Sequence, residues 1–461
     1  MVFSSIFFIF CFLPVFMLIY YLVPNRLRNI ILIIGSMIFY AWGEPVYLIL
    51  MLFSAGFNYY MGMELEKDTE TRAKGNLIFA VIINIGILFF FKYSGFLLDT
   101  IGGIFRITIP HPELSLPIGL SFYTFKNLSY IFDVYMGKVS AQHNIITFAV
   151  YSTMFPHMTA GPIVRYTDIE DQLSYHPVSL SRFGFGAELF IKGLAKKVIL
   201  ADNLAAIFAE ISGAGTELSV VSAWLGIIAY TLQIYLDFSG YSDMAIGIGK
   251  MLGFDFQKNF DYPYISTSVS EFWRRWHISL GSWFRDYIYI PLGGNRVSTV
   301  KHIRNILVVW ALTGLWHGAS WNFVLWGLYY GLLLLLEKFV LQNVLERIPS
   351  WARTVYTMFA VMIGWVFFSQ TSFSAMGRYF GGMFGIGASA FADAQALYCL
   401  KSGLVLFVIS IICCRPGMYL RFRRLLQTKP RTAIAVNMIL FAVSIAYMVY
   451  NSYTPFLYVQ F

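Results

Sequence analysis

Long apolar segments separated by short polar ones run through this sequence from beginning to end. A helix needs about 20 apolar residues to span lipid, and several segments reach that length. Others are shorter or more polar, which is typical of re-entrant helices covered by protein. The pattern predicts an all-α polytopic membrane protein with about 10–12 transmembrane helices plus re-entrant and interfacial helices. The expected helical segments are 2–23, 29–42, 45–62, 77–98, 117–135, 145–158, 186–201, 219–237, 241–253, 303–316, 319–341, 353–369, 400–414 and 432–450.

Composition supports a lipid environment. Hydrophobic residues make up 58% of the chain and charged residues 12%, whereas soluble domains carry about 25% charged residues. The net charge of +9 comes from basic residues in short loops between apolar segments, which is the usual pattern for membrane proteins and not for nucleic-acid binding. We therefore expect the lipid bilayer as a partner, no nucleic acid, and a single membrane domain over residues 1–461 with its chemistry between 117 and 330.

The distribution of basic residues predicts an orientation. The segment 415–431 holds six basic residues and no acidic one, and Arg26 and Arg28 follow the first apolar segment directly. Such loops face the cytoplasm, so both termini are expected on the outer side. The segment 99–116 contains one Arg together with Gly, Thr and Pro residues, and it suits an outer loop.

The segment 268–296 predicts an amphipathic helix. Ser268 and Glu271 have the spacing of a capping box. Aromatic and basic side chains then fall on different faces, as in helices that lie in the membrane interface, and we expect Trp273, Trp276 and Arg285 to hold this one at the cytoplasmic interface. The apolar stripe contains Trp273, His277, Leu280 and Phe284, and the other face contains Arg274, Arg275, Ser282 and Arg285.

His277 lies on the apolar stripe, where a structural and a functional histidine fit equally well. Pro291 and the run Gly293-Gly294-Asn295 end the helical pattern. Irregular backbone at membrane depth is tolerated where it is buried in protein or lines a water-filled cavity, so this turn is expected in such a place.

His317 stands in the otherwise apolar segment 312–327. Its neighbours three and four residues away on a continuous helix are Thr313, Gly314, Ser320 and Trp321. Small residues allow a second helix to approach closely, so this stripe is expected to face the protein interior. An ionisable side chain at such depth is a candidate for function.

Polar residues also interrupt the segment 233–247, where Ser239, Tyr241 and Ser242 separate Asp237 from Asp243. Gly240 predicts a break between two half-spans. The carboxylates could orient a histidine, bind a cation or cap the second half-helix, and a structural or supporting role is favoured.

Two further segments, 116–135 and 155–165, carry polar residues inside apolar surroundings. These residues could line a channel, although each alone fits a packing or snorkelling role. They are Lys126, Asn127, Asp133, His157 and Arg165.

Several motifs are missing. The sequence has no Walker A loop, dinucleotide-binding glycine fingerprint or HExxH, and no GxSxG elbow. A serine esterase or an ATP-driven pump is therefore not expected. No metal site is predicted either, because the four cysteines, Cys11, Cys399, Cys413 and Cys414, lack metal-ligand spacing.

The longest of these motifs resemble a known family. The quoted segments are EFWRRWHISLGSWFRDYIYIPLGGNR, LTGLWHGASWNFVLWG, SFYTF, AGPIVR, DFSGYSDMAIG and the terminal PFLYVQF. Together they resemble the membrane-bound O-acyltransferase family, and most closely its alginate O-acetyltransferase-like branch. The IPLGGNR ending favours that branch over the D-alanyl transfer proteins of teichoic acid synthesis.

The resemblance places the family's invariant membrane histidine at His317 and its second histidine at His277. It implies a central cavity across the cell (plasma or inner) membrane, with no bound cofactor. The acyl donor, acetyl-CoA or an acyl-carrier thioester, would enter from the cytoplasm. The acceptor would be an extracytoplasmic polysaccharide, reached through an SGNH-type acetyltransferase. The expected channel-lining or supporting residues are Asp237, Ser239, Tyr241, Asp243, Trp273, Arg274, Trp276, Arg285, Asn295, Trp316 and Ser320.

Acyl transfer from a thioester to a hydroxyl requires a general base, and a buried neutral histidine can supply it. A transient acyl-histidine is the competing mechanism. Polar residues at mid-membrane and broken spans also suit a transporter or flippase, and a scaffold for an extracytoplasmic acetyltransferase is a third possibility. A lone buried His317 and the lack of internal repeats favour the enzyme.

Overall fold

A computed structural model describes residues 1–67, 69–112, 114–213, 218–417, 420–421, 424, 428–450 and 456. All regular structure in these residues is helical, which confirms the predicted all-α class. The chain forms two compact units. The first contains residues 1–190 and 241–257, and the second contains residues 191–240 together with the described residues of 258–457. The prediction of one membrane domain stays a prediction.

Seven helices in the described residues are long and apolar enough to cross a membrane. The protein is therefore a multi-pass membrane protein, as predicted, although about 10–12 crossings stays a prediction. The described residues also contain two shorter apolar helices, Phe8–Leu22 and Ser94–Phe105. The seven are Leu48–Lys67, Glu70–Lys92, Val220–Met251, Trp321–Arg347, Ser350–Ser369, Ala394–Cys413 and Pro430–Tyr450.

Most helices of the first unit overlap the predicted segments. The segment predicted at 77–98 is divided between α4 and α5, and α5 continues to Phe105, so the expected outer loop at 99–116 is helical in its first part. Helix α8 was not predicted. The helices are η1 (Phe8–Phe12), α1 (Leu13–Leu22), η2 (Asn25–Leu27), α2 (Arg28–Ala41), α3 (Leu48–Lys67), α4 (Glu70–Lys92), α5 (Ser94–Phe105), α6 (Leu120–Tyr135), α7 (Ile145–Thr153), η3 (Phe155–His157) and α8 (Tyr166–Ser174), followed by α9 (Leu180–Ala195), which continues into the second unit.

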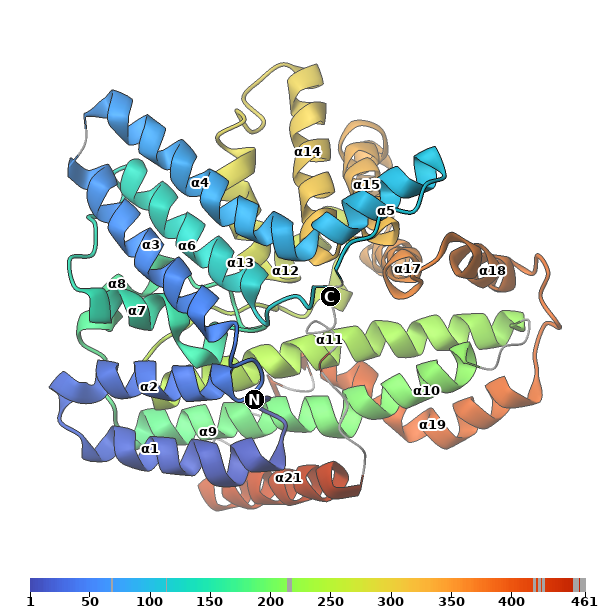
Figure 1. Cartoon of the computed structure of the whole chain (residues 1–461). Helices are drawn as coiled ribbons and strands as arrows, with labels where there is room; N and C mark the ends of the chain where they lie inside the picture. The colour runs from blue at the N-terminus through green and yellow to red at the C-terminus, as the bar shows by residue number, and fades with distance from the viewer. Residues whose placement is uncertain are drawn as a thin grey trace. The chain divides into compact units, whose positions relative to one another are not determined.

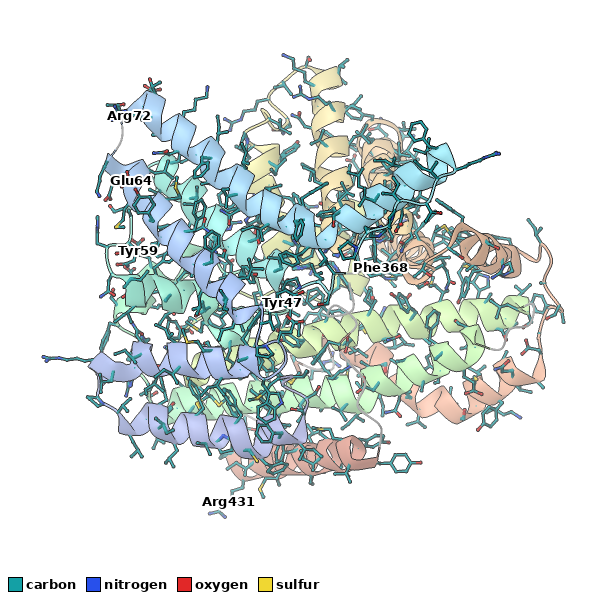
Figure 2. The ribbon with its side chains drawn as sticks, in the orientation of Figure 1. Tyr47, Tyr59, Glu64, Arg72, Phe368 and Arg431 are labelled. Atoms are coloured by element: carbon teal, nitrogen blue, oxygen red, sulfur yellow. The ribbon has the colours of Figure 1, made fainter. Side chains whose placement is uncertain are left out.

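Helices α3, α4 and α6 pack side by side (Figure 1). Two buried amides join α3 to α4: Asn58 Nδ2 donates to Asn84 Oδ1 at 3.0 Å, and Asn84 Nδ2 donates to Asn58 Oδ1 at 2.8 Å. Figure 2 shows the charged residues Glu64 and Arg72 near the connected ends of the two helices. The apolar helices α3 and α4 are thus joined by hydrogen bonds between amides, and charged residues lie near their connected ends.

The second unit holds the remaining helices. They are η4 (Lys196–Ala201), α10 (Asp202–Ser212), α11 (Val220–Met251, shared with the first unit), η5 (Pro263–Ile265), α12 (Val269–Arg275), α13 (Ile278–Phe284), η6 (Arg285–Tyr289), α14 (Thr299–His317), α15 (Trp321–Leu336), η7 (Glu337–Leu341), α16 (Gln342–Arg347), α17 (Ser350–Ser369), α18 (Phe373–Phe384), α19 (Ala394–Cys413) and α21 (Pro430–Tyr450).

Helices α14 and α15 form a tight pair. A Cβ atom added to Gly314 would lie 2.3 Å from the carbonyl oxygen of Phe323, and one added to Gly327 would lie 2.4 Å from that of Trp310. Both contacts are with backbone, so a side chain at either position would separate the helices. The prediction that the small residue beside His317 faces another helix is confirmed.

The predicted break at Gly240 is wrong. Helix α11 is continuous from Val220 to Met251. A Cβ atom at Gly240 would lie 2.7 Å from the carbonyl oxygen of Gly193, so the glycine permits close packing against the end of α9 and does not interrupt α11. The two segments predicted at 219–237 and 241–253 are therefore one helix.

The prediction of a single amphipathic helix in the segment 268–296 is also wrong. Helix α12 ends at Arg275, and α13 begins at Ile278 after His277 adopts the left-handed conformation, with φ 46° and ψ 53°. The start of α12 was predicted correctly, because the Ser268 hydroxyl accepts the Glu271 N–H at 3.0 Å. The turn predicted at 291–295 is confirmed by positive φ at Gly293 and Gly294.

Candidate active site

His317 is the last residue of α14, and Gly318 ends the helix in extended backbone. Its side chain is 3% exposed. The ring packs edge-to-face against Trp326 of α15 at 4.8 Å and against Phe368 of α17, labelled in Figure 2, at 5.5 Å between centroids. Three helices therefore hold this imidazole inside an aromatic enclosure.

Two of the neighbours predicted for His317 are wrong. Because α14 stops at His317, Ser320 and Trp321 begin α15 and do not continue the His317 stripe. The Ser320 hydroxyl donates to Asn322 Oδ1, and the Asn322 amide donates to the Phe367 carbonyl at 3.3 Å. These polar groups tie the start of α15 to α17.

His277 occupies the turn between α12 and α13, outside the candidate spans, and is 2% exposed. Its Nδ1 lies 3.2 Å from Asn259 Oδ1, and its ring packs edge-to-face on Phe238 at 4.8 Å. Burial lowers the pKa of His277 to about 3. The ring is therefore neutral at physiological pH.

One tryptophan connects the two histidines. The Trp316 ring lies 5.8 Å from that of His277 and 5.1 Å from that of His317. Trp273 belongs to the same aromatic group, because it packs against Trp326 at 5.4 Å. The structure thus brings together four of the predicted site residues in the second unit: two from α12 and the turn that follows it, and two from the end of α14.

Other predicted site residues lie at the protein surface. Arg274, Arg285 and Asn295 are exposed, and Arg285 binds the carboxylate of its neighbour Asp286, with Nε 2.6 Å from Oδ1.

The interface-anchor role predicted for Trp276 is wrong. Its indole is 1% exposed and packs at 5.0 Å against Trp365.

Asp237 belongs to a buried ion cluster. Lys197 Nζ lies 2.8 Å from Asp237 Oδ1 and 2.6 Å from Asp202 Oδ1, which joins α11 to the π-helical turn η4. This geometry agrees with the favoured structural role for Asp237. Sequence reasoning missed Lys197 and Asp202, although a lysine within the apolar run after Leu194 was a readable signal.

The remaining residues of the 233–247 segment divide between the units. Ser239 is buried in the second unit. Tyr241 and Asp243 belong to the first unit, where the Tyr241 and Thr159 hydroxyls share a hydrogen bond and the Tyr241 ring stacks on Phe3 at 4.8 Å. Tyr241 is therefore part of the first unit's core.

The first unit contains a second buried polar pair. Lys126 Nζ lies 2.9 Å from His157 Nδ1 and donates to the Ser152 carbonyl at 3.0 Å, and both side chains are fully buried. His157 ends the 3-10 turn η3 within a buried segment from Met154 to Val164. Two of the predicted channel-lining residues thus form one hydrogen-bonded pair.

Comparison with known proteins identifies the family of this chain. The profile of the membrane-bound O-acyltransferase family (MBOAT) matches residues 46–376. A probable alginate O-acetylase (AlgI) of Pseudomonas aeruginosa is 44% identical over 84% of this chain and 75% of its own length. The corresponding protein of Pseudomonas putida is 38% identical over the full length of both chains. A peptidoglycan O-acetyltransferase of Helicobacter pylori is 32% identical over 84% of this chain and 80% of its own length.

The family match confirms the resemblance seen in the sequence, and it covers both histidines and the helices that enclose them. An acyltransferase requires an acyl donor, so the chain uses one. The protein belongs to the membrane-bound O-acyltransferase family and is an O-acyltransferase.

Proposed function

We propose that this chain moves acetyl groups from a cytoplasmic thioester across the cell membrane to hydroxyls of an extracytoplasmic polysaccharide, with His317 and His277 as its catalytic histidines. The observation that carries the proposal is that both buried imidazoles pack on Trp316 within the family-matched region. The named relatives acetylate alginate and peptidoglycan, both of which present sugar hydroxyls.

The chemistry requires few groups. A base accepts the proton of the attacking hydroxyl as its oxygen bonds to the thioester carbonyl, and the departing thiolate takes the proton when the C–S bond breaks. His317 is the proposed base, and His277 supports it. General-base catalysis contributes roughly 10²–10⁴ in rate. If the acetyl group rests first on a histidine nitrogen, the proton of the ring N–H goes to the departing thiolate. The hydroxyl then attacks in a second step, and its proton returns to the ring as the acetyl group leaves.

The aromatic enclosure suits either route. Trp316, Trp326 and Phe368 surround His317 with apolar rings, and a water-excluding site strengthens electrostatic interactions with the reacting groups and protects the thioester from hydrolysis. Acetyl-CoA or an acyl-carrier thioester is the proposed donor. The final acceptor step is proposed to use an SGNH-type acetyltransferase outside the membrane.

The acetyl transfer is tested in cells that make an acetylated surface polysaccharide and lack their own copy of this protein. Supplying the chain should restore ester content in the exported polymer, and membranes from these cells should consume labelled acetyl-CoA. His317→Gln at matched protein level is the control. Equal ester content with and without the chain would contradict the proposal.

The proposed direction of transfer requires a particular orientation of the chain in the membrane. This orientation is tested by cysteine labelling after the native cysteines are replaced. Arg415, Arg421, Arg424, Lys429 and Arg431 support a cytoplasmic position for this loop; Arg423 and most of the terminal PFLYVQF segment lie outside the described residues. Thr428→Cys should resist an impermeant reagent in intact cells, whereas Pro112→Cys in the expected outer loop should react. Reaction at Thr428 and protection at Pro112 would reverse the orientation.

A further inference from the structure

The backbone at His277 is held in the left-handed region by the segment that precedes α12. The Ile278 N–H donates to the carbonyl of Asn259 at 2.9 Å, and the Asp261 N–H donates to the carbonyl of Arg275 at 2.9 Å. Left-handed backbone at a residue other than glycine persists only where the surroundings enforce it, and such positions concentrate at functional sites. The segment 259–261 supplies that enforcement.

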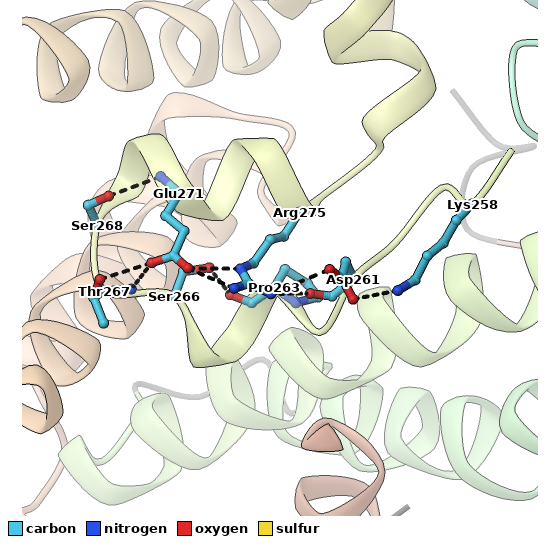
Figure 3. Close-up of polar contacts among 8 residues, drawn as sticks. All are labelled: Lys258, Asp261, Pro263, Ser266, Thr267, Ser268, Glu271 and Arg275. Carbon is cyan, nitrogen blue, oxygen red and sulfur yellow. Dashed lines mark hydrogen bonds and ion pairs between the residues drawn. The ribbon is translucent and has the colours of Figure 1, made fainter. Parts of the chain in front are cut away.

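A polar network fixes the segment 259–261 in place (Figure 3). The Arg275 guanidinium donates to the Asp261 carbonyl at 3.0 Å and to Glu271 Oε1 at 2.9 Å. The Asp261 carboxylate also binds Lys258. Glu271 in turn accepts the N–H and hydroxyl of Thr267 at 2.8 and 2.9 Å. The network joins the segment to α12 through charged and hydrogen-bonding groups.

The side chain of Asn259 is 1% exposed and meets three groups of the turn. Its Oδ1 accepts the Ser279 N–H at 3.2 Å and the Ser279 hydroxyl at 2.9 Å, and it lies 3.2 Å from His277 Nδ1. A backbone N–H can only donate, so the amide atom facing it must be the oxygen. His277 Nδ1 faces the same oxygen and must therefore carry the hydrogen.

The assignment leaves the lone pair of His277 on Nε2, because a neutral imidazole has one donor and one acceptor nitrogen. We propose that Asn259 is a positioning residue for acyl transfer, which fixes His277 as its Nδ1–H tautomer and reserves Nε2 to accept a proton. This inference rests on the proposed function of His277. A proton that His277 holds at Nε2 in support of His317 leaves the Nδ1–H bond to Asn259 intact, and it passes on to the departing thiolate.

The test compares variants of the full chain in isolated membranes with labelled acetyl-CoA. Asn259→Leu removes the acceptor at similar volume, and kcat should fall about 10- to 100-fold while KM changes by less than about 2-fold. Ser279→Ala is the matched control, because it removes one donor to Asn259 and a 3.5 Å contact with His277 Nδ1 but leaves the contact between Asn259 Oδ1 and that nitrogen. Its rate should stay within about 3-fold of the wild type.

Asn259→Asp separates positioning from structural support. It keeps an acceptor at His277 Nδ1 and should recover most of the lost kcat. The new carboxylate also favours the imidazolium form, so the acid limb of the kcat–pH profile should move to higher pH. The groups known to face the ring are uncharged in this range: Phe238 of α11, Trp316 of α14 and Ser279 of α13.

The outcomes of the comparison are distinct. No acetyl transfer by the wild type would contradict the proposed function itself. An active wild type, an impaired His277→Asn variant and an unimpaired Asn259→Leu variant would contradict the positioning role alone. Equal losses in Asn259→Leu and Asn259→Asp, with an unshifted pH profile, would show that Asn259 supports the turn and nothing more.

Discussion

The two histidines of the second unit are positioned by opposite means. His317 completes the last turn of a regular helix, and the Gly314–Gly327 crossing of α14 and α15 places its ring among aromatic side chains. His277 stands between two short helices in left-handed backbone. Its Nδ1–H donates to Asn259 Oδ1, which also accepts the Ser279 hydroxyl. Helix packing sets the first position, and polar contacts set the second.

The difference determines which kind of substitution each position tolerates. The surroundings of His317 are sensitive to volume, because apolar rings and backbone contacts leave no room for change. The surroundings of His277 are sensitive to the placement of donors and acceptors. Three experiments test this contrast.

The largest effect is expected at His317. His317→Gln keeps a polar side chain of similar length but lacks a base, so acyl transfer should fall at least about 100-fold. Glutamine is preferable to alanine here, because alanine would leave a cavity between Trp326 and Phe368. The measurement is polymer ester content at equal amounts of membrane-inserted protein. Wild-type ester content in this variant would exclude His317 as the catalytic base.

The second-largest effect is expected at the crossing of α14 and α15. Gly314→Ala places a methyl group 2.3 Å from the Phe323 carbonyl, and overpacking of this kind costs about 1–3 kcal/mol. The thermal unfolding temperature in detergent should fall. Gly377→Ala in α18 is the control, because nothing lies within 4 Å of the added Cβ atom. Equal unfolding temperatures for the two variants would mean that the crossing tolerates separation.

The smallest effect concerns acid stability. Burial lowers the pKa of His277 to about 3 in the folded protein, whereas an unperturbed histidine titrates near pH 6.5. Between these values the unfolded chain binds a proton that the folded chain does not, so stability is complete above about pH 6.5 and decreases on acidification. The contribution is at most about 1.4 kcal/mol per pH unit.

The acid effect is measured as the loss of unfolding temperature between pH 7.5 and pH 5.5. His277→Asn should lose less than the wild type, because asparagine does not titrate and tolerates left-handed backbone. An identical loss in both proteins would show that His277 is not protonated on unfolding in this range.

The sequence predicted features that depend on nearby residues. The apolar runs gave the spans, Ser268 gave the start of α12, and Gly314 indicated the helix contact beside His317. The predictions were wrong for features that depend on residues distant in the sequence. The role of Gly240 depends on Gly193 in another helix, and the break at His277 depends on Asn259, which lies 18 residues upstream. Periodicity cannot show such contacts, because it describes one helix in isolation.

The paired amides of Asn58 and Asn84 bear on how the protein is made. A slip of one helical turn between α3 and α4 would displace the facing residues by about 5.4 Å. Both amides would then lose their partner in a solvent that offers no replacement. We therefore expect the Asn58–Asn84 pair to fix the register of α3 against α4 as this hairpin enters the bilayer during synthesis. This would occur before the later segments that hold the two histidines have left the ribosome.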